Sequence, residues 1–383
     1  MSWGILYYGF AVFLRPMEID LHASRVEVTG AFSAGLLVTA ALAVPVGRWI
    51  DRRGARGLMT AGSLLGTALM LAWARVETLP ALYSVWILMG VVLATTLYEP
   101  AFAAVVSWFT RHRDRALMIV TLTAGLASTI FVPLATWLLV RQGWRPALVT
   151  LAIILAIGTI PIHALILRRP PAGGDAPAGG DAPAGRARAP SVGLRAVLRM
   201  PVFWVLSVAF LVGNFATVSV TVHLIPYLTE RGYSLQAAGV ALAWVGVAQL
   251  AGRVVFAPIA SRVGHSWLTA AIFVVQAAGI ALLALLGRMP VLALVVLTLG
   301  AANGMATLAR ATLAAEMFGA ASYGAIAGAL SVGTTMARAL GPVGASLLRV
   351  WLDGYVPVFW LLAGVLVLAA ISVGASARNA AQS

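Results

Sequence analysis

The chain has 383 residues, of which 61% are apolar and 10% charged, whereas an ordinary soluble domain is roughly 45–50% apolar and 25% charged. This composition excludes a soluble globular protein. All 26 basic side chains are arginine, against 12 acidic ones, and no cysteine is present. Because the arginines stand in small groups at the ends of apolar runs rather than on one aromatic-rich face, nucleic-acid binding is not expected. The absence of cysteine excludes disulfides and cysteine-ligated metals.

Twelve apolar runs follow one another along the chain, and a helix that crosses a bilayer needs ~20 such residues. Six runs precede one long polar stretch and six follow it. We therefore predict an all-α membrane protein with twelve transmembrane helices in two six-helix bundles. The runs cover residues 2–21, 28–50, 58–76, 80–109, 115–140 and 144–167, and then 201–229, 235–261, 267–287, 290–318, 322–348 and 355–376.

The polar stretch, residues 168–200, separates a predicted N-terminal bundle (1–167) from a predicted C-terminal bundle (201–383). It holds the tandem repeat Gly174–Gly179 and Gly180–Gly185, and its density of Pro and Gly is typical of a flexible linker. Loop arginines accumulate on the cytoplasmic side of membrane proteins. Their distribution here predicts a multi-pass membrane protein with both termini in the cytoplasm.

The connection after the second run reads Gly47-Arg48-Trp49-Ile50-Asp51-Arg52-Arg53-Gly54-Ala55-Arg56. A glycine here permits backbone torsions that other residues resist, and an aspartate accepts hydrogen bonds from arginines or from a helix N-terminus. The string resembles the G-x-x-x-D-R-x-G-x-R signature of the major facilitator superfamily. A degenerate copy, Ser261-Arg262-Val263-Gly264, follows 210 residues later and lacks the acid. The resemblance implies a pseudo-symmetric 6+6 fold and a conformational motif formed by Gly47, Asp51, Arg52, Gly54 and Arg56.

A narrower resemblance extends over most of the chain. It is carried by Tyr7–Leu14, by Pro100-Ala101-Phe102, by Val222–Leu228 and by Gly341-Pro342. These strings are similar to those of the bacterial monocarboxylate porters and the oxalate:formate antiporters. The resemblance implies a secondary transporter of small mono- or dicarboxylates in a bacterial inner membrane. It also implies rocker-switch alternating access, with protons or a counter-anion as candidate co-substrates.

Two alternatives to an anion transporter remain. One is a multidrug or other small-molecule efflux transporter of the same superfamily, although the fifth run, with Gly125 to Pro133, lacks the Gly-Pro signature of drug/proton antiporters. The other is a membrane enzyme or a channel, but neither H-E-x-x-H nor G-x-S-x-G occurs. We predict no catalytic residue, no metal and no cofactor, and we expect a monomer in the lipid bilayer.

Four charged residues lie well inside predicted spans, away from the span ends, and a charge near the bilayer centre costs at least ~2.5–3.5 kcal/mol. They are Glu99, Arg253, Arg310 and Arg338, one acid against three bases, which suits an anionic substrate. The resemblance implies that Arg253 binds the substrate carboxylate and that Arg338 is a second basic ligand. Glu99 and Arg310 lie 211 residues apart, in nearly equivalent places of the two repeats, and are expected to pair as gating or coupling residues.

Other polar side chains are weaker candidates. The hydroxyls of Tyr7, Tyr8 and Tyr98 suit a cavity that binds a polar anion, although aromatic residues in spans more often serve in packing. His223 is a candidate proton carrier, because histidine titrates near neutrality; the alternative is a neutral hydrogen-bonding residue beside the helix kink at Pro226.

Overall fold

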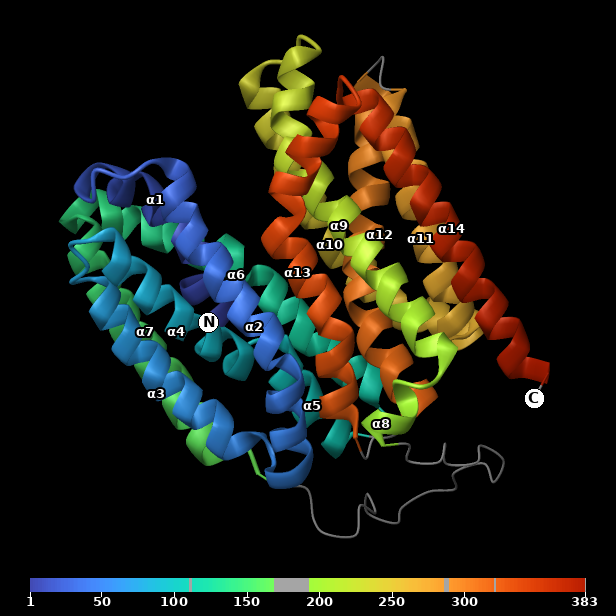
Figure 1. Cartoon of the computed structure of the whole chain (residues 1–383), viewed down its shortest axis with the longest axis horizontal. Coiled ribbons are helices and arrows are strands. Elements are labelled where there is room, and N and C mark those ends of the chain that lie inside the picture. Colours follow the sequence, from blue (N-terminus) through green and yellow to red (C-terminus); the bar gives the residue numbers. More distant parts are fainter. Residues whose placement is uncertain (110–111, 169–192, 286–288, 320–321, 383) are drawn as a thin grey trace. The chain divides into compact units, whose positions relative to one another are not determined.

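The structure is a computed structural model that describes residues 1–109, 112–168, 193–285, 289–319 and 322–382. The described segments of the first half form nine helical elements: η1 (Trp3–Tyr8), α1 (Gly9–Asp20), α2 (Arg25–Arg53), α3 (Ala55–Trp73), α4 (Leu79–Thr96), α5 (Tyr98–Trp108), α6 (Arg113–Gln142), α7 (Trp144–Pro161) and η2 (Ile162–Ile166). Those of the second half form seven: α8 (Leu194–Val197), α9 (Pro201–Glu230), α10 (Leu235–Val263), α11 (His265–Ala284), α12 (Met289–Phe318), α13 (Tyr323–Trp351) and α14 (Tyr355–Gln382) (Figure 1).

Each predicted apolar run corresponds to one helix or to two consecutive helices, so the all-α, twelve-helix prediction is confirmed. Ten spans in the described segments are long and apolar enough to cross a bilayer, with α4 joined to α5 and α7 joined to η2. The other two are η1 with α1, which is short, and α13, which is rich in glycine, alanine and hydroxyl residues. Most of the predicted linker, including its tandem repeat, lies outside the described residues.

The chain divides into two compact units, each described here by itself. Unit 1 comprises Met1–Ala116, Thr123–Leu194 and Ala315–Thr335, and unit 2 comprises Leu117–Leu122, Arg195–Ala314 and Met336–Ser383. Helices α6 and α13 therefore contribute residues to both units. In unit 1, α2 packs along α4 and α3 along α7; in unit 2, α11 packs along α14 (Figure 1). The boundaries at 167 and 201 stay a prediction.

The two halves repeat the same local structure at a spacing of 210 residues. The Ser24 side chain caps α2 by accepting from the backbone N–H of Glu27, and the Ser234 side chain caps α10 by accepting from Ala237. Both helices end at a glycine with positive φ, Gly54 at 80° and Gly264 at 81°. Serine caps and left-handed glycines are local signals, so the repeat is encoded in the sequence.

Close backbone contacts repeat at the same spacing. A Cβ atom on Gly90 of α4 would meet the carbonyl oxygen of Gly35 in α2. In the second half, a Cβ atom on Gly300 of α12 would meet the carbonyl oxygen of Val245 in α10. Small residues allow membrane helices to approach to backbone contact. Equivalent helix pairs, α2 with α4 and α10 with α12, are therefore in backbone contact in the two halves.

Two irregularities depart from the predicted runs. The run 80–109 was expected to be one helix, but it breaks at Leu97 (φ −88°, ψ −146°) between α4 and α5. Pro100 explains the break, because proline lacks the N–H that the carbonyl four residues earlier needs and is tolerated in a first helical turn. The run 2–21 begins with the π-helical turn η1, which carries two of the candidate tyrosines. Breaks and π-helical turns occur often at functional sites.

Candidate functional site

The motif after α2 is joined to the first turn of α13. Asp51 accepts a hydrogen bond at Oδ1 from the backbone N–H of Gly324 (2.7 Å) and one at Oδ2 from that of Ala325 (2.8 Å). The first N–H groups of a helix have no partner within the helix and carry its partial positive charge, so a carboxylate is their preferred cap. All three residues belong to unit 1. This contact is the helix cap that the motif predicts for its aspartate.

Glycines of the motif make that cap geometrically possible. A Cβ atom on Gly47 would meet the carbonyl oxygen of Gly324, and one on Gly328 would meet that of Ala43. Helices α2 and α13 thus approach to backbone contact at Gly47 and again at Ala43, four and eight residues before Asp51 in α2. Gly54, with φ 80° and ψ 168°, ends α2 and begins α3. Arg56 stands exposed in the first turn of α3.

We expect Asp51→Asn to weaken the contact between α2 and α13. The amide keeps one acceptor but turns an N–H₂ group toward a backbone donor and loses the charge that complements the helix dipole, at a cost of about 1–2 kcal/mol. The initial rate of transport should fall several-fold, and the melting temperature of the purified protein should drop. Asp353→Asn, which removes an exposed acid after α13, is the matched control. Equal rates and melting temperatures for both variants would show that the cap has no role.

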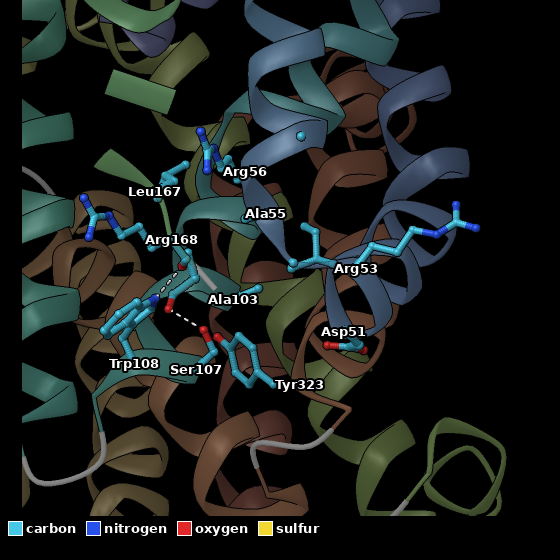
Figure 2. Close-up of a pocket in the computed structure, with 14 residues that line it drawn as sticks. Asp51, Arg53, Ala55, Arg56, Ala103, Ser107, Trp108, Leu167, Arg168 and Tyr323 are labelled. Atoms are coloured by element: carbon cyan, nitrogen blue, oxygen red, sulfur yellow. Dashed lines mark hydrogen bonds between the residues drawn. The ribbon is translucent and has the colours of Figure 1, made fainter. Parts of the chain in front are cut away.

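A cavity of about 370 Å³ lies beside the motif in unit 1 (Figure 2). Its walls come from the end of α2, the first turn of α3, the end of α5, the residues Leu167 and Arg168, and Tyr323 of α13. The indole Nε1 of Trp108 donates to the carbonyl oxygen of Arg168 at 2.9 Å. We name this cavity the arginine pocket, after Arg56 and Arg168 in its wall.

Arg253 is one of two buried arginines in the described part of unit 2. Only 6% of its surface is exposed, and its Nη1 donates to the backbone carbonyl of Thr121 at 2.6 Å. Thr121 belongs to the segment Leu117–Leu122 of α6, which is part of the same unit. In the described segments no carboxylate lies within 4.0 Å of Arg253, and its buried Nε has no acceptor. The structure therefore holds a buried guanidinium whose charge is not balanced by a described acid.

The residue before Arg253 fixes the position of its backbone. A Cβ atom on Gly252 would meet the carbonyl oxygen of Ala301 in α12, and one on Gly304 would meet that of Gln249. Helices α10 and α12 are therefore in backbone contact at the level of Arg253. A guanidinium on a rigid backbone, held by a carbonyl at one nitrogen, is well oriented for binding.

The other intramembrane charges are divided between the units. Glu99 stands half-buried in the first turn of α5 in unit 1. Arg310 of α12 is 6% exposed, and Arg338 of α13 is half-buried; both belong to unit 2. The pairing of Glu99 with Arg310 stays a prediction. Arg253 and Arg338, the two expected carboxylate ligands, belong to one unit.

The three candidate tyrosines of unit 1 gather around Trp3, which the sequence did not single out. The Trp3 ring lies 4.8 Å from the ring of Tyr7, 6.1 Å from that of Tyr8 and 4.8 Å from that of Tyr98. Tyr8 remains 36% exposed. The π-helical turn η1 carries Trp3, Tyr7 and Tyr8, and the ring contact between Trp3 and Tyr98 joins this turn to the first turn of α5. The structure thus brings the tyrosines together as one aromatic cluster.

His223 of α9 lies between two other helices of unit 2. Its Nδ1 is 3.2 Å from the hydroxyl of Tyr355 at the start of α14, and its Nε2 is 3.4 Å from the hydroxyl of Ser346 on α13. Next to it, Arg349 forms a 2.7 Å ion pair with Glu230, and its guanidinium lies 4.4 Å from the centre of the Tyr355 ring. Both ring nitrogens of His223 therefore have a hydroxyl group within hydrogen-bond distance.

Comparison with known proteins decides the family. The model of the Major Facilitator Superfamily matches residues 1–342. The chain belongs to the Major Facilitator Superfamily. It shares its fold with the E. coli fucose:proton symporter FucP. The structure of a single-residue variant of that symporter has a TM-score of 0.70, with 15% identity and 96% of both chains covered. A FucP structure in the outward conformation has a TM-score of 0.74, with 15% identity, 97% of this chain covered and 95% of the other.

Curated relatives in the superfamily are transporters as well. The chain is 26% identical to monocarboxylate transporter 13 of Bos taurus over 66% of its own length and 57% of that protein. It is 26% identical to the oxalate:formate antiporter of Oxalobacter formigenes over 63% of its own length and 56% of that protein. The matched part is thus little more than half of each relative. Family and relatives support a multi-pass membrane transporter rather than an enzyme.

Proposed function

We propose that this superfamily member is a secondary transporter of small organic anions and that Arg253 binds the carboxylate of the substrate. The observation that carries the proposal is the buried guanidinium of Arg253, which has no described acid within ion-pair distance. Burying an arginine without a counter-charge is costly, so such residues mark substrate pathways in membrane proteins. A carboxylate ligand supplies both the missing charge and the missing acceptors.

The hydrogen bond to Thr121 selects which edge of the guanidinium serves the ligand. Nη1 is engaged by the backbone carbonyl, whereas Nε has no acceptor in the described part of the chain. Nε and Nη2 form one edge of the planar guanidinium, and this edge matches the two oxygens of a carboxylate. Arginine therefore grips the anion through two parallel, charge-assisted hydrogen bonds.

Other residues have secondary roles in the proposal. Arg338, in the same unit as Arg253, binds the second carboxylate of a dicarboxylate, and the tyrosine cluster around Trp3 supplies hydroxyl donors. Glu99, Arg310 and His223 take part in gating or coupling. With the N-terminus in the cytoplasm of a bacterium, the cap by Asp51 forms when the cytoplasmic side is closed, and its loss opens that side during alternating access. The names of the two relatives, a monocarboxylate transporter and an oxalate:formate antiporter, support carboxylates as the substrate class.

Uptake into proteoliposomes tests this function. The purified chain is reconstituted, and uptake of labelled formate, lactate, oxalate and succinate is measured with and without a pH gradient, and with and without counter-anion inside. We expect saturable uptake of at least one carboxylate that unlabelled carboxylates compete away. Accumulation of cationic or neutral lipophilic compounds without any carboxylate uptake would contradict the proposal and favour an efflux transporter.

The pH dependence of transport tests His223. Because a histidine exchanges its proton near neutral pH, we expect His223→Gln to retain anion exchange but to lose stimulation by a pH gradient. Ser346→Ala is the matched control, since it removes the weaker 3.4 Å neighbour and keeps the imidazole. If the His223 variant keeps the pH profile of the wild type, the proton does not travel through this side chain.

A further inference from the structure

The arginine pocket is separate from the proposed carboxylate site, because its lining includes neither Arg253 and Arg338 nor any tyrosine of the cluster around Trp3. Its volume of about 370 Å³ is within the range of small-molecule sites, roughly 300–1,000 Å³. The pocket has one acidic wall residue, Asp51, whose two oxygens are already hydrogen-bonded to the first turn of α13. In the part of the chain that the structure describes, Asp51 forms no ion pair with Arg56 or Arg168.

The basic groups of the pocket come from separate segments. Arg56 stands in the first turn of α3, and Arg168 follows the end of η2. Figure 2 shows their side chains on the same side, with Leu167 between them, whereas Arg53 extends away from both. The guanidinium of Arg53 instead lies 4.3 Å from the centre of the Trp49 ring. Two arginines, contributed from positions more than a hundred residues apart in the sequence, thus serve one cavity.

The backbone of α3 adds to this positive potential. Gly54, Ala55, Arg56 and Gly57 all line the pocket, and the N-terminus of α3 has no side-chain cap. The N–H groups of an uncapped first turn bind anions, and the helix dipole favours them further. The arginines and the helix end therefore select the same kind of ligand, an oxyanion with several acceptor oxygens.

The surroundings indicate the depth of the pocket in the bilayer. Trp108 in its wall is 45% exposed, and Trp49 on the neighbouring turn of α2 is 44% exposed. Exposed tryptophans beside arginines are typical of the level of the lipid headgroups. An oxyanion abundant at that level is phosphate.

We propose that the arginine pocket binds a phosphate group, held by Arg56, Arg168 and the first turn of α3. Two sources supply this chemistry, the headgroup of an anionic phospholipid and free phosphate. Tyr323 of α13 and Asp51 of α2 also form the wall. The bound phosphate therefore lies against the contact between α2 and α13, and it stabilises unit 1 in this arrangement.

Ligand-induced thermal stabilisation in detergent tests the proposal. The probes are inorganic phosphate, short-chain phosphatidylglycerol and short-chain phosphatidylcholine, each at constant ionic strength. We expect the melting temperature of the wild type to rise with phosphatidylglycerol and not with phosphatidylcholine. An equal rise with inorganic phosphate would assign the site to free phosphate, whereas a response to the lipid alone would assign it to the headgroup; both depend on the same arginines.

Three variants and two matched controls decide the location. Arg56→Gln and Arg168→Gln should each weaken the apparent affinity about tenfold, because each removes a charge-assisted hydrogen bond to phosphate. Gly57→Asp should abolish the response yet raise the melting temperature without ligand, since a carboxylate in the first turn replaces the anion. The controls are Gly57→Ala, whose Cβ atom meets nothing within 4 Å, and Arg75→Gln, which removes an exposed charge beyond the other end of α3.

The thermal responses of the three pocket variants and the two controls decide whether phosphate binds in the arginine pocket. Responses that are lost in the three pocket variants and kept in both controls support the proposal. Wild-type responses in Arg56→Gln, Arg168→Gln and Gly57→Asp overturn it, as does a stabilisation that phosphatidylcholine produces equally well. Gly57→Asp also controls for unfolding. A variant whose melting temperature is raised but no longer depends on the phosphate probes has lost the binding site and kept the fold.

Discussion

Arg253→Gln should reduce carboxylate uptake by about 100-fold while leaving the protein folded. The variant removes a positive charge and the edge of the guanidinium that faces the ligand, which together contribute about 3 kcal/mol to anion binding. The fold should tolerate the change because the described structure gives Arg253 one hydrogen bond, to a backbone carbonyl, and no acid that would be left unpaired. The measurement is uptake into proteoliposomes, together with the melting temperature with and without carboxylate.

Two further substitutions separate the role of Arg253 from a general effect of charge. Arg253→Lys should recover little, because an ammonium group does not present two parallel donors. Arg262→Gln, nine positions later on the same helix and exposed, should behave as the wild type. With Arg338→Gln, a dicarboxylate should lose binding and a monocarboxylate should keep it. Normal carboxylate binding by both Arg253→Gln and Arg338→Gln would end the carboxylate proposal.

Gly47→Ala is the second change from which we expect a large effect, a loss of at least tenfold in transport rate. The added Cβ atom would meet the backbone carbonyl of Gly324, and a helix backbone does not rotate away as a side chain does. The first turn of α13 must then move off α2, and both hydrogen bonds to Asp51 are lost with it. Gly57→Ala, a glycine of the same connection with free space around its Cβ position, should transport normally.

The absence of native cysteine makes this movement directly measurable. Ser331 of α13 is 1% exposed, so Ser331→Cys introduces a single thiol that is buried in the present arrangement of the helices. We expect a maleimide to label it several-fold faster in the Gly47→Ala background than in the Gly57→Ala background. Identical labelling rates would mean that α13 stays in place and that the glycine contact does not control closure.

Hydropathy alone located the helices, because a bilayer requires long apolar segments whatever their internal geometry. It did not reveal the break at Leu97 or the π-helical turn at Trp3–Tyr8. Both are changes in the register of backbone hydrogen bonds, which leave the apolar pattern untouched. Pro100 was a usable signal for the break. No residue type offers a comparable signal for the π-helical turn.

The candidate site was predictable where a rare residue type carried the information. Arg253 stood out as a charge in an apolar run, and Asp51 stood out within its motif. Their partners did not, since Thr121, Gly324 and Ala325 act through backbone atoms that every residue possesses. Trp3 was missed for a related reason, because one aromatic residue in a span looks like any other until the fold gathers several of them.

The internal repeat has an energetic consequence. Residue 261, which is 210 positions after Asp51, is a serine whose hydroxyl donates to the carbonyl of Pro258 within its own helix at 2.9 Å. The second half thus lacks a carboxylate at the position where, in the first half, Asp51 caps α13. In the proposed alternating-access cycle, a cap that contributes about 1–2 kcal/mol makes the resting occupancies of the two access states differ roughly 5- to 30-fold before any substrate binds. The substrate-free transporter should therefore mostly populate one of the two proposed access states, and the cycle should begin with substrate binding to that state.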